Sequence, residues 1–377
     1  MQPSSAGREL YVGVMSGTSL DGIDALLVDL GGARPVVLGD VHHPFDAALR
    51  AELFALQRTG PDELHRMALA ANVLADACAA AIVASLRQAG VAPSELRAAG
   101  VHGQTIRHRP ELGYTSQLLN PSRVAEGAGV TVVADFRSRD VAAGGQGAPL
   151  VPAFHAALFR HAQEARVVAN IGGIANVTGL PPAVSGRPVT GWDTGPGNVL
   201  LDAWCRRCTG AEFDEDGRWA ATGRVLPELL AAWRSDPYFA LVPPKSTGRD
   251  LFDLDWLLER VPAAAAAADV QATLLQLTAD AIAADVAVHC PDAARLLVCG
   301  GGAYNGALRQ ALGDSLARAG VTGATVERTD ELGLPARQVE AMAFAWLARQ
   351  ALAGRPGNLP EVTGARGLRV LGGIYPA

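Results

Sequence analysis

Three glycine-rich segments contain the residue types that could bind phosphate groups. The first runs from Met15 to Asp24, the second from Ala169 to Asn176 and the third from Val298 to Asn305. Several backbone N–H groups can converge on a phosphate where Cβ atoms are absent and positive φ angles are cheap, and glycine meets both conditions. Glycine-rich turns also close ordinary hairpins, so one such loop alone leaves both interpretations open. The three together favour a site for a nucleoside triphosphate.

Asp193 is the candidate for a catalytic carboxylate. It follows a predicted strand, precedes Gly195 and Gly197, and lies shortly before a helix expected from Asn198. The N-terminal field of a helix favours a nearby anion. The alternative is that Asp193 only caps this helix, a role for which Asn198 is better placed. The motif context favours catalysis by Asp193 as a general base.

Other polar residues suggest chemistry less clearly. Asp21 and Asp24, in the first glycine-rich segment, could support a hydrated Mg²⁺, although Asp is common in turns. His102 and His108 are six residues apart without a neighbouring carboxylate or cysteine cluster, so a sugar-binding or structural role is favoured over a metal site. Lys245 is the only lysine among 32 basic residues, which indicates either a specific role or chance.

Composition limits the class of protein. The 377 residues are 49% hydrophobic and 19% charged, as in a globular protein of two domains. The net charge of -6, without a basic cluster, argues against nucleic-acid binding. No apolar signal core and no stretch of bilayer-spanning length is recognised, so a cytoplasmic protein is expected. Five cysteines, an odd number, indicate no disulfide framework, and the Cys205 and Cys208 pair is taken as structural.

Strands alternate with helices along the chain, which predicts α/β domains with covered sheets. The expected strands are 11–15, 25–30, 36–41, one ending at Val101, 130–134, 166–170, 176–180, one entering Gly191, 296–299 and 325–328. The expected helices are 46–57, 62–89, one from Leu150, 198–207, 225–234, 251–260, 270–288, one after Asn305 and 336–353. The first two glycine-rich hairpins share one plan about 150 residues apart, as an internal duplication would produce. Neither a Walker loop nor a dinucleotide-binding Gly-x-Gly-x-x-Gly motif is present.

The chain resembles the anhydro-N-acetylmuramic acid kinase family from about Tyr11 to its C-terminus. The segments that carry the resemblance are 15–24, 103–107, 134–137, 140–149, 192–198, 244–249, 299–302 and 362–364. Thr194 stands where some relatives are expected to carry Cys or another small residue. The resemblance implies a two-domain actin-like ATPase fold with a central nucleotide cleft. The expected domains are 1–140 with 360–377, and 141–359.

The resemblance also implies a reaction. The family converts 1,6-anhydro-N-acetylmuramic acid, ATP and water into N-acetylmuramic acid 6-phosphate and ADP during cell-wall recycling. Asp193 would then activate the water, Glu340 would lie close to the reaction centre, and Mg²⁺ would accompany ATP. An arginine should meet the lactyl carboxylate, with Arg107, Arg137 and Arg139 as candidates.

The remaining expected contacts follow from the matched motifs. ATP contacts are expected from Gly17, Thr18, Ser19, Leu20, Asp21, Gly22, Ile23, Asp24, Asn170, Gly172, Gly173, Gly300, Gly301 and Gly302. Substrate contacts are expected from His102, Gln104, Arg107, Asp135, Arg137, Gly195 and Asn198.

Two other functions stay open at this point. One is an ordinary hexose or hexosamine kinase of the same fold, which would phosphorylate an existing hydroxyl without water. The other is a non-enzymatic nucleotide switch related to actin or chaperones, which is disfavoured because the sequence shows no added peptide-binding domain. The expected partner is a small sugar, without nucleic acid or membrane, and a homodimer is an open alternative.

Overall fold

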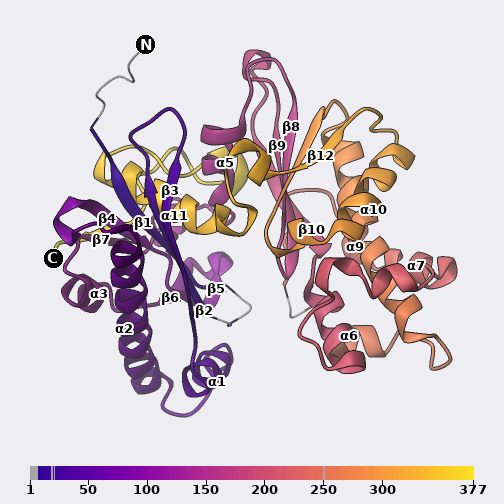
Figure 1. Ribbon diagram of the computed structural model, residues 1–377, viewed down its shortest axis with the longest axis horizontal. Helices are drawn as coiled ribbons and strands as arrows, with labels where there is room; N and C mark the ends of the chain where they lie inside the picture. The colour runs from indigo at the N-terminus through magenta and orange to yellow at the C-terminus, as the bar shows by residue number, and fades with distance from the viewer. Residues whose placement is uncertain (1–6, 18–19, 21, 249–250) are drawn as a thin grey trace. The chain divides into compact units, whose positions relative to one another are not determined.

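The computed structural model describes residues 7–17, 20, 22–248 and 251–377, which form two compact units (Figure 1). The first unit contains residues up to Phe154 together with 338–377, and the second contains 155–337. Each unit has its own sheet and its own covering helices. The two units are described separately below.

The first unit is built on a six-stranded sheet with the order β13-β7-β4-β1-β2-β3. Its strands are β1 (Leu10–Met15), β2 (Gly22–Asp29), β3 (Val36–Pro44), β4 (Leu96–Val101), β7 (Val132–Ala134) and β13 (Gly373–Tyr375). Strands β1, β2 and β3 form an antiparallel meander, whereas β4 pairs parallel to β1 and β7 pairs parallel to β4. Strand β1 is apolar and almost fully buried, as expected for a central strand covered on both faces.

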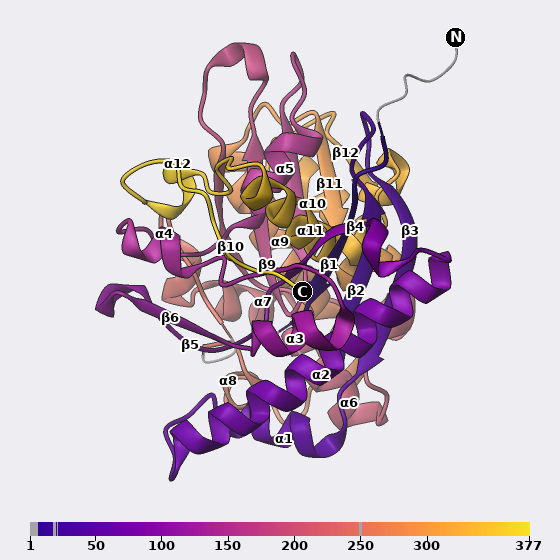
Figure 2. The same ribbon diagram turned by 90° about the vertical axis from the view of Figure 1, so that its left-hand side faces the viewer.

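The helices of the first unit are α1 (Ala47–Ala55), α2 (Glu63–Ala89), α3 (Pro121–Ala128), α4 (Ser138–Ala142), α11 (Val339–Leu352) and α12 (Pro360–Thr363). Helix α1 begins where Asp46 accepts a hydrogen bond from the N–H of Leu49, and α2 ends at Gly90 in the left-handed conformation. A separate two-stranded ribbon, β5 (Gln104–Arg109) with β6 (Tyr114–Leu118), stands apart from the main sheet (Figure 2). No strand was predicted between Val101 and residue 130.

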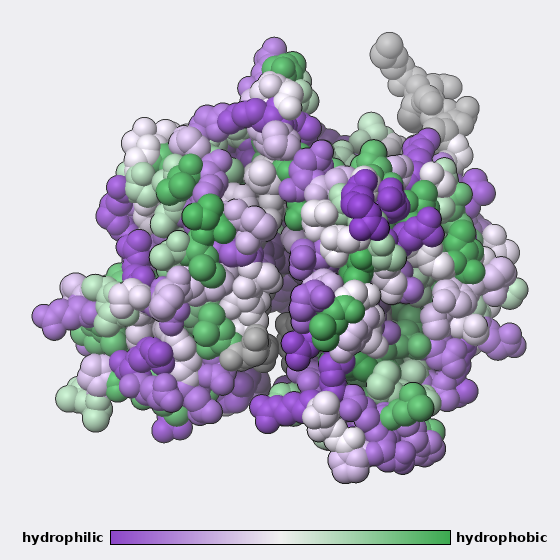
Figure 3. Space-filling view, turned by 180° about the vertical axis from the view of Figure 1, so that it is seen from behind, coloured by the Kyte–Doolittle hydropathy of each residue, from purple (hydrophilic) through white to green (hydrophobic). Residues whose placement is uncertain are grey.

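Helix α2 corrects one expectation. It is long and apolar enough to cross a membrane by length and composition, although no such stretch was recognised in the sequence. In the structure α2 packs on β2, β3 and α3, and Leu74, Ile82 and Leu86 are buried. The face of the molecule in Figure 3 intersperses hydrophilic with hydrophobic residues. The apolar character of α2 is therefore explained by its contact with the sheet.

The second unit is built on a five-stranded sheet with the order β10-β9-β8-β11-β12. Its strands are β8 (Arg166–Ile171), β9 (Ile174–Leu180), β10 (Thr190–Pro196), β11 (Arg295–Cys299) and β12 (Thr325–Arg328). Its helices are α6 (Val199–Thr209), α7 (Pro227–Arg234), α8 (Leu254–Leu258), α9 (Ala267–His289) and α10 (Gly306–Arg318). Helix α5 (Val151–Phe159) crosses the boundary between the units.

The two sheets share one topology. In each, three strands form an antiparallel meander whose first strand also pairs with a parallel strand, and a second parallel strand follows outside it. This repeat confirms the predicted α/β class and supports the internal duplication read from the two hairpins. It also shows where each glycine-rich hairpin lies, between the first and second strands of its sheet.

The unit boundaries differ from the expected domain boundaries at 140 and 359. Residues 141–154 and 338–359 belong to the first unit, because α11 packs against β1 and β4. This packing is close: a Cβ on Gly13 would lie 1.7 Å from the carbonyl oxygen of Ala341, and one on Gly100 would lie 2.1 Å from that of Phe344. Glycines at these two positions let the helix backbone approach the sheet.

Candidate functional site

The second glycine-rich loop has its carbonyl groups fixed by the segment at the start of α6. The N–H groups of Gly197 and Val199 donate to the carbonyl oxygen of Gly173, at 2.9 and 3.0 Å, and the N–H of Asn198 donates to that of Gly172 at 2.8 Å. The Asn198 side-chain amide donates to the carbonyl oxygens of Ile171 and Gly172, at 3.0 and 3.1 Å. In a trans peptide the C=O and N–H point in opposite directions. The N–H groups that follow these carbonyls therefore point away from α6, in an arrangement suited to an anion.

The third glycine-rich segment packs against the second. Gly300 has a φ of 80°, and a Cβ there would lie 2.5 Å from Oδ1 of Asn170 and 2.7 Å from the carbonyl oxygen of Ile171. A Cβ on Gly302 would lie 2.5 Å from a side-chain carbon of Ile171. The structure therefore brings Asn170 and the loop at 172–173 together with Gly300 and Gly302, as the sequence analysis expected of one site.

Asp193 lies inside β10, at a register shift between Asp193 and Gly195. The sequence analysis placed it after a strand, and this placement is corrected. Asp193 precedes α6 by several residues and does not cap the helix. Asn198, at the N-cap position, makes no side-chain cap hydrogen bond either. Its side chain is turned to the second loop, where Nδ2 donates to the carbonyl oxygen of Ile171. Bulges often redirect a side chain beside a functional site.

The Asp193 carboxylate is held by one neighbouring segment. Its Oδ2 accepts hydrogen bonds from the Ser246 hydroxyl and from the N–H of Thr247, both at 3.0 Å. Burial raises the pKa of Asp193, while the bonds from Thr247 and Ser246 and the charge of Lys245 lower it. Among the described residues both hydrogen bonds go to Oδ2, which leaves Oδ1 for a water molecule. The Thr247 hydroxyl is buried and finds no hydrogen-bond partner in the described part of the chain.

The main chain of Asp193 is held as well. Its N–H donates to the carbonyl oxygen of Lys245 at 3.1 Å, and its carbonyl oxygen accepts from the Tyr238 hydroxyl at 2.8 Å. Tyr238 lies on a short 3-10 turn, Pro237–Ala240. Of these contacts the sequence analysis singled out only Lys245. Tyr238, Ser246 and Thr247 could have been found only because they lie close to this lysine in the sequence.

In the first unit, the buried His102 pairs with the partly buried Arg137. Arg137 donates from Nε and from its terminal nitrogen to Nε2 of His102, at 3.1 and 2.9 Å, and to the carbonyl oxygen of Gly147 at 2.8 Å. Burial and the charge of Arg137 lower the pKa of His102 to about 3, so the imidazole is neutral. Burial lowers the pKa of Arg137 to about 10, and the charge of Glu340 opposes that shift. Glu340 lies partly buried in the first turn of α11.

Gln104 lies near this pair in the chain, and its Oε1 accepts a hydrogen bond from the Ser16 hydroxyl at the start of the first glycine-rich loop. Asp135 adopts a φ of 59° and accepts from the hydroxyl of Ser138. Arg107 is engaged elsewhere: it forms an ion pair with Glu63 at 2.6 Å. The guanidinium of Arg107 is thus occupied at the start of α2.

The first glycine-rich loop is only partly described. Thr18, Ser19 and Asp21 lie outside the described residues. Leu20 is buried with a φ of 54°, a conformation rare for a branched side chain. Ile23 is buried in β2, and Oδ1 of Asp24 lies within hydrogen-bonding distance of Nδ1 of His42, at 2.8 Å. The described residues contain no group of three or more His, Cys, Asp or Glu that could hold a metal ion.

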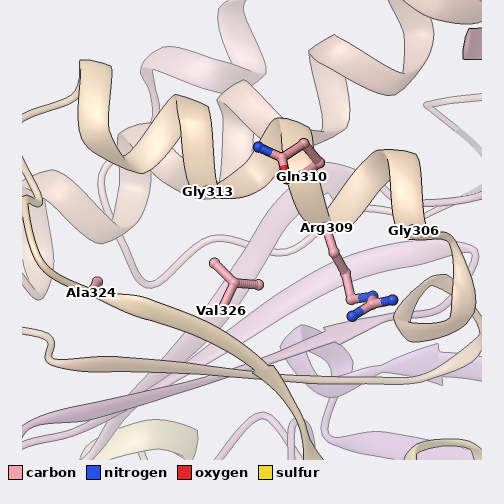
Figure 4. Close-up of a pocket in the computed structure, with 6 residues that line it drawn as sticks. All are labelled: Gly306, Arg309, Gln310, Gly313, Ala324 and Val326. Carbon is pink, nitrogen blue, oxygen red and sulfur yellow. The ribbon is translucent and has the colours of Figure 1, made fainter.

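A cavity of about 360 Å³ lies in the second unit between α10 and the start of β12 (Figure 4). Its lining residues are Gly306, Arg309, Gln310, Gly313, Ala324 and Val326. Figure 4 shows the Arg309 side chain extending from α10 away from Gln310. The cavity shares no residue with the contacts of Asp193, so it does not contribute to that group of residues.

Two α/β units with one sheet order, each with a glycine-rich loop between its first two strands, place the chain among the actin-like ATPase folds, which include sugar kinases. The chain belongs to the anhydro-N-acetylmuramic acid kinase family, whose sequence profile matches residues 9–377. It is therefore an ATP-dependent sugar kinase by family, as the resemblance implied.

Two relatives named anhydro-N-acetylmuramic acid kinase align with nearly the whole chain. An anhydro-N-acetylmuramic acid kinase from Cupriavidus pinatubonensis is 56% identical over 98% of this chain and 99% of its own length. One from Bordetella pertussis is 57% identical over 98% of this chain and 96% of its own. Among solved structures, a ROK family glucokinase from Streptomyces griseus in complex with glucose and AMPPNP aligns over 90% of this chain and 99% of its own, with 16% identity and a TM-score of 0.44.

Proposed function

We propose that this protein converts 1,6-anhydro-N-acetylmuramic acid, ATP and water into N-acetylmuramic acid 6-phosphate and ADP, in the cytoplasm during cell-wall recycling. The observation that carries the proposal, beside the family, is the Asp193 carboxylate, which is fixed on one oxygen by Ser246 and Thr247. A reaction that uses water at a sugar acetal needs one positioned base, whereas an ordinary sugar kinase deprotonates only a hydroxyl.

Asp193 accepts a proton from water as the water oxygen bonds to C1 of the sugar, and the bond between C1 and O6 breaks through an oxocarbenium-like state. The freed O6 attacks the γ-phosphorus of ATP, the bond from that phosphorus to the β-phosphate oxygen breaks, and ADP leaves. The proton on Asp193 is released to solvent. The raised pKa of Asp193 brings its basicity closer to what the transfer needs.

We assign recognition of the lactyl carboxylate to Arg137. Of the three candidate arginines, Arg107 pairs with Glu63 and Arg139 is exposed on α4, whereas the hydrogen bonds of Arg137 go to a neutral imidazole and a carbonyl. A guanidinium with neutral hydrogen-bond partners keeps its attraction for an anion. His102 fixes the plane of the guanidinium, and Glu340 supplies negative charge near it.

We assign phosphate binding in each unit to its own glycine-rich loop, because backbone N–H groups supply most of the stabilisation in phosphoryl transfer. Mg²⁺ would neutralise charge on the phosphates. Mg²⁺ usually keeps several waters and binds largely through substrate phosphates. No step above is assigned to it.

The test is ADP release by the purified protein with Mg²⁺-ATP and either the anhydro sugar, N-acetylmuramic acid or N-acetylglucosamine. We expect turnover of the anhydro sugar, incorporation of ¹⁸O from labelled water at C1, and a loss of about 10² to 10⁴-fold in kcat for Asp193→Asn. Ser235→Ala, at an exposed serine whose hydroxyl donates to the carbonyl oxygen of Ala232, is the control. Turnover of the open sugars alone, without label at C1, would move the function to an ordinary hexosamine kinase.

A further inference from the structure

The only lysine of the chain is buried. The Lys245 side chain is 2% exposed and forms an ion pair with Asp285 of α9 at 3.0 Å. Its Nζ also lies 5.2 Å from the centre of the Tyr238 ring. Ion pairs this deeply buried are costly to build, so they are weak evidence for stability and call for another explanation.

Asp285, the ion-pair partner of Lys245, also contacts β10, the strand that contains Asp193. Asp285 accepts a hydrogen bond from Nε1 of Trp192 at 3.0 Å. Asp285 therefore connects residue 192, next to Asp193 in β10, with residue 245, whose carbonyl oxygen accepts the N–H of Asp193. Tyr238 closes the arrangement, because its ring faces Lys245 and its hydroxyl donates to the carbonyl oxygen of Asp193.

The geometry requires a lysine. A compact ammonium on a flexible stem fits between a carboxylate and an aromatic face, whereas a guanidinium is larger, planar and presents its donors in a fixed fork. Every other basic residue of the chain is an arginine. The retention of a lysine at the one place where Tyr238 and Asp285 enclose the cation agrees with this steric difference.

We infer that Lys245 is a positioning residue: paired with Asp285, it fixes residues 244–248 so that Ser246 and the N–H of Thr247 hold the Asp193 carboxylate for water activation. The inference rests on the proposed function, in which Asp193 is the base. Lys245 touches neither sugar nor ATP in this role. It acts through the segment that carries the hydrogen-bond donors to Asp193.

The charges around Asp193 add a second, measurable effect. Among the described residues, the titratable groups that face its strand from the packed elements are Tyr238, Lys245, and Asp285 and His289 on α9. Of these, the charge of Lys245 lowers the pKa of Asp193, against the larger effect of burial. Because the base must be ionised, loss of that charge should move the acid limb of the kcat profile to higher pH.

The experiment compares four variants of the full chain. The double variant Lys245→Met with Asp285→Asn removes both charges while leaving an acceptor for Trp192, and Lys245→Arg keeps the charge in a different shape. The double variant should lose about 10- to 100-fold in kcat with its KM for ATP unchanged, and Lys245→Met alone, which removes only the positive charge, should also move the acid limb to higher pH. Lys245→Arg should lose kcat with its acid limb unmoved. Arg187→Gln with Asp292→Asn, an exposed ion pair of the same unit, is the matched control.

The outcomes separate the two proposals. If Asp193→Asn is inactive while a folded double variant or Lys245→Arg keeps wild-type kcat, the positioning role of Lys245 is overturned. If the double variant fails to fold, the kcat of Lys245→Arg alone tests the role: a lowered kcat supports positioning by Lys245, and a wild-type kcat overturns it. If Asp193→Asn keeps its activity, the assignment of the base fails instead, whatever the lysine variants do.

Discussion

The two sheets share the order of five strands, to which the first adds the edge strand β13, but they carry different residues at equivalent positions. In the first unit Gly13 pairs with Gly100, and α11 packs so closely that a Cβ on either glycine would overlap its backbone. Counted back from the end of the first strand, the equivalent pair in the second unit is Ala169 with Val298, both fully buried. The shared strand order therefore carries different packing in the two units.

The buried carboxylates of the two units differ in the same way. Asp140 in the first unit is fully buried and accepts from the N–H of Gly147, the amide of Asn358 and the hydroxyl of Thr363, at 2.8, 2.7 and 2.8 Å. Both of its oxygens are engaged in joining two chain segments. Asp193 has both of its hydrogen bonds on one oxygen. A carboxylate engaged on both oxygens supports structure, whereas one with a free oxygen can accept a proton.

Gly13→Ala should give the largest effect. The new methyl group would lie 1.7 Å from the carbonyl oxygen of Ala341 and 2.8 Å from the N atom of Ala345, so α11 must move. We expect a loss of about 4 kcal/mol or more in the free energy of unfolding, measured by urea titration. The matched change in the second unit, Ala169→Gly, should cost only about 1 to 2 kcal/mol from a lost methyl and added chain entropy. Equal losses at the two positions would refute the difference in packing.

Asp140→Asn should destabilise the first unit by about 2 to 3 kcal/mol, because its amide group would face a donor where the carboxylate accepted. The same titration measures it. Asp76→Asn, in an exposed ion pair with Arg123, is the control and should cost about 1 kcal/mol or less. Asp193→Asn should instead lower kcat with little change in stability. If Asp140→Asn were instead stable and inactive, Asp140 would have the catalytic role and Asp193 the structural one.

Gly197→Ala and Gly172→Ala compare the two sides of the second loop. A Cβ on Gly197 would lie 2.4 Å from the carbonyl oxygen of Gly172, whereas one on Gly172 would meet only the oxygen of Ile174 at 3.5 Å. We expect Gly197→Ala to cost about 2 kcal/mol and to raise KM for ATP, because the loop must shift. Gly172→Ala should retain the stability of the wild type. A shift in KM for ATP alone in that variant would indicate that the methyl group meets the phosphates.

The sequence predicted elements that depend on local pattern. The expected helix at 62–89 is α2 at 63–89, because apolar periodicity and the following Gly90 mark it, and the expected strand at 325–328 is β12. Strands β5 and β6 were missed, because their polar residues show no alternation and their pairing depends on contacts made in the folded chain.

The candidate site was predictable only in part. Asp193 stood out through its glycine-rich context, but its partners Tyr238, Ser246 and Thr247 lie 45, 53 and 54 residues away in the chain. No local pattern encodes such distances. Asp285 carried a weaker signal, since an acid among the buried residues of α9 needs a partner. Of the ion pair between Lys245 and Asp285, the sequence analysis had singled out only the lysine.

A pH dependence of stability is expected from both units. Burial lowers the pKa of His102 in the first unit and of His155 in the second to about 3. In the unfolded chain both titrate near about 6.5, so below that pH the unfolded state binds more protons and stability falls as pH decreases toward 3. Each histidine should contribute a slope of about 1.4 kcal/mol per pH unit between these values.

Urea titrations at a series of pH values between 4 and 7 test this, with His102→Gln and His155→Gln as a matched pair of variants. Each substitution should remove one proton from the difference between the folded and unfolded states, and so flatten the slope by the same amount. The absolute stability of His102→Gln also changes, because Arg137 loses its acceptor at Nε2. Only the slope reports burial. A wild-type slope in one variant would mean that its histidine is protonated in the folded unit, and for His102 it would remove the neutral acceptor that orients Arg137.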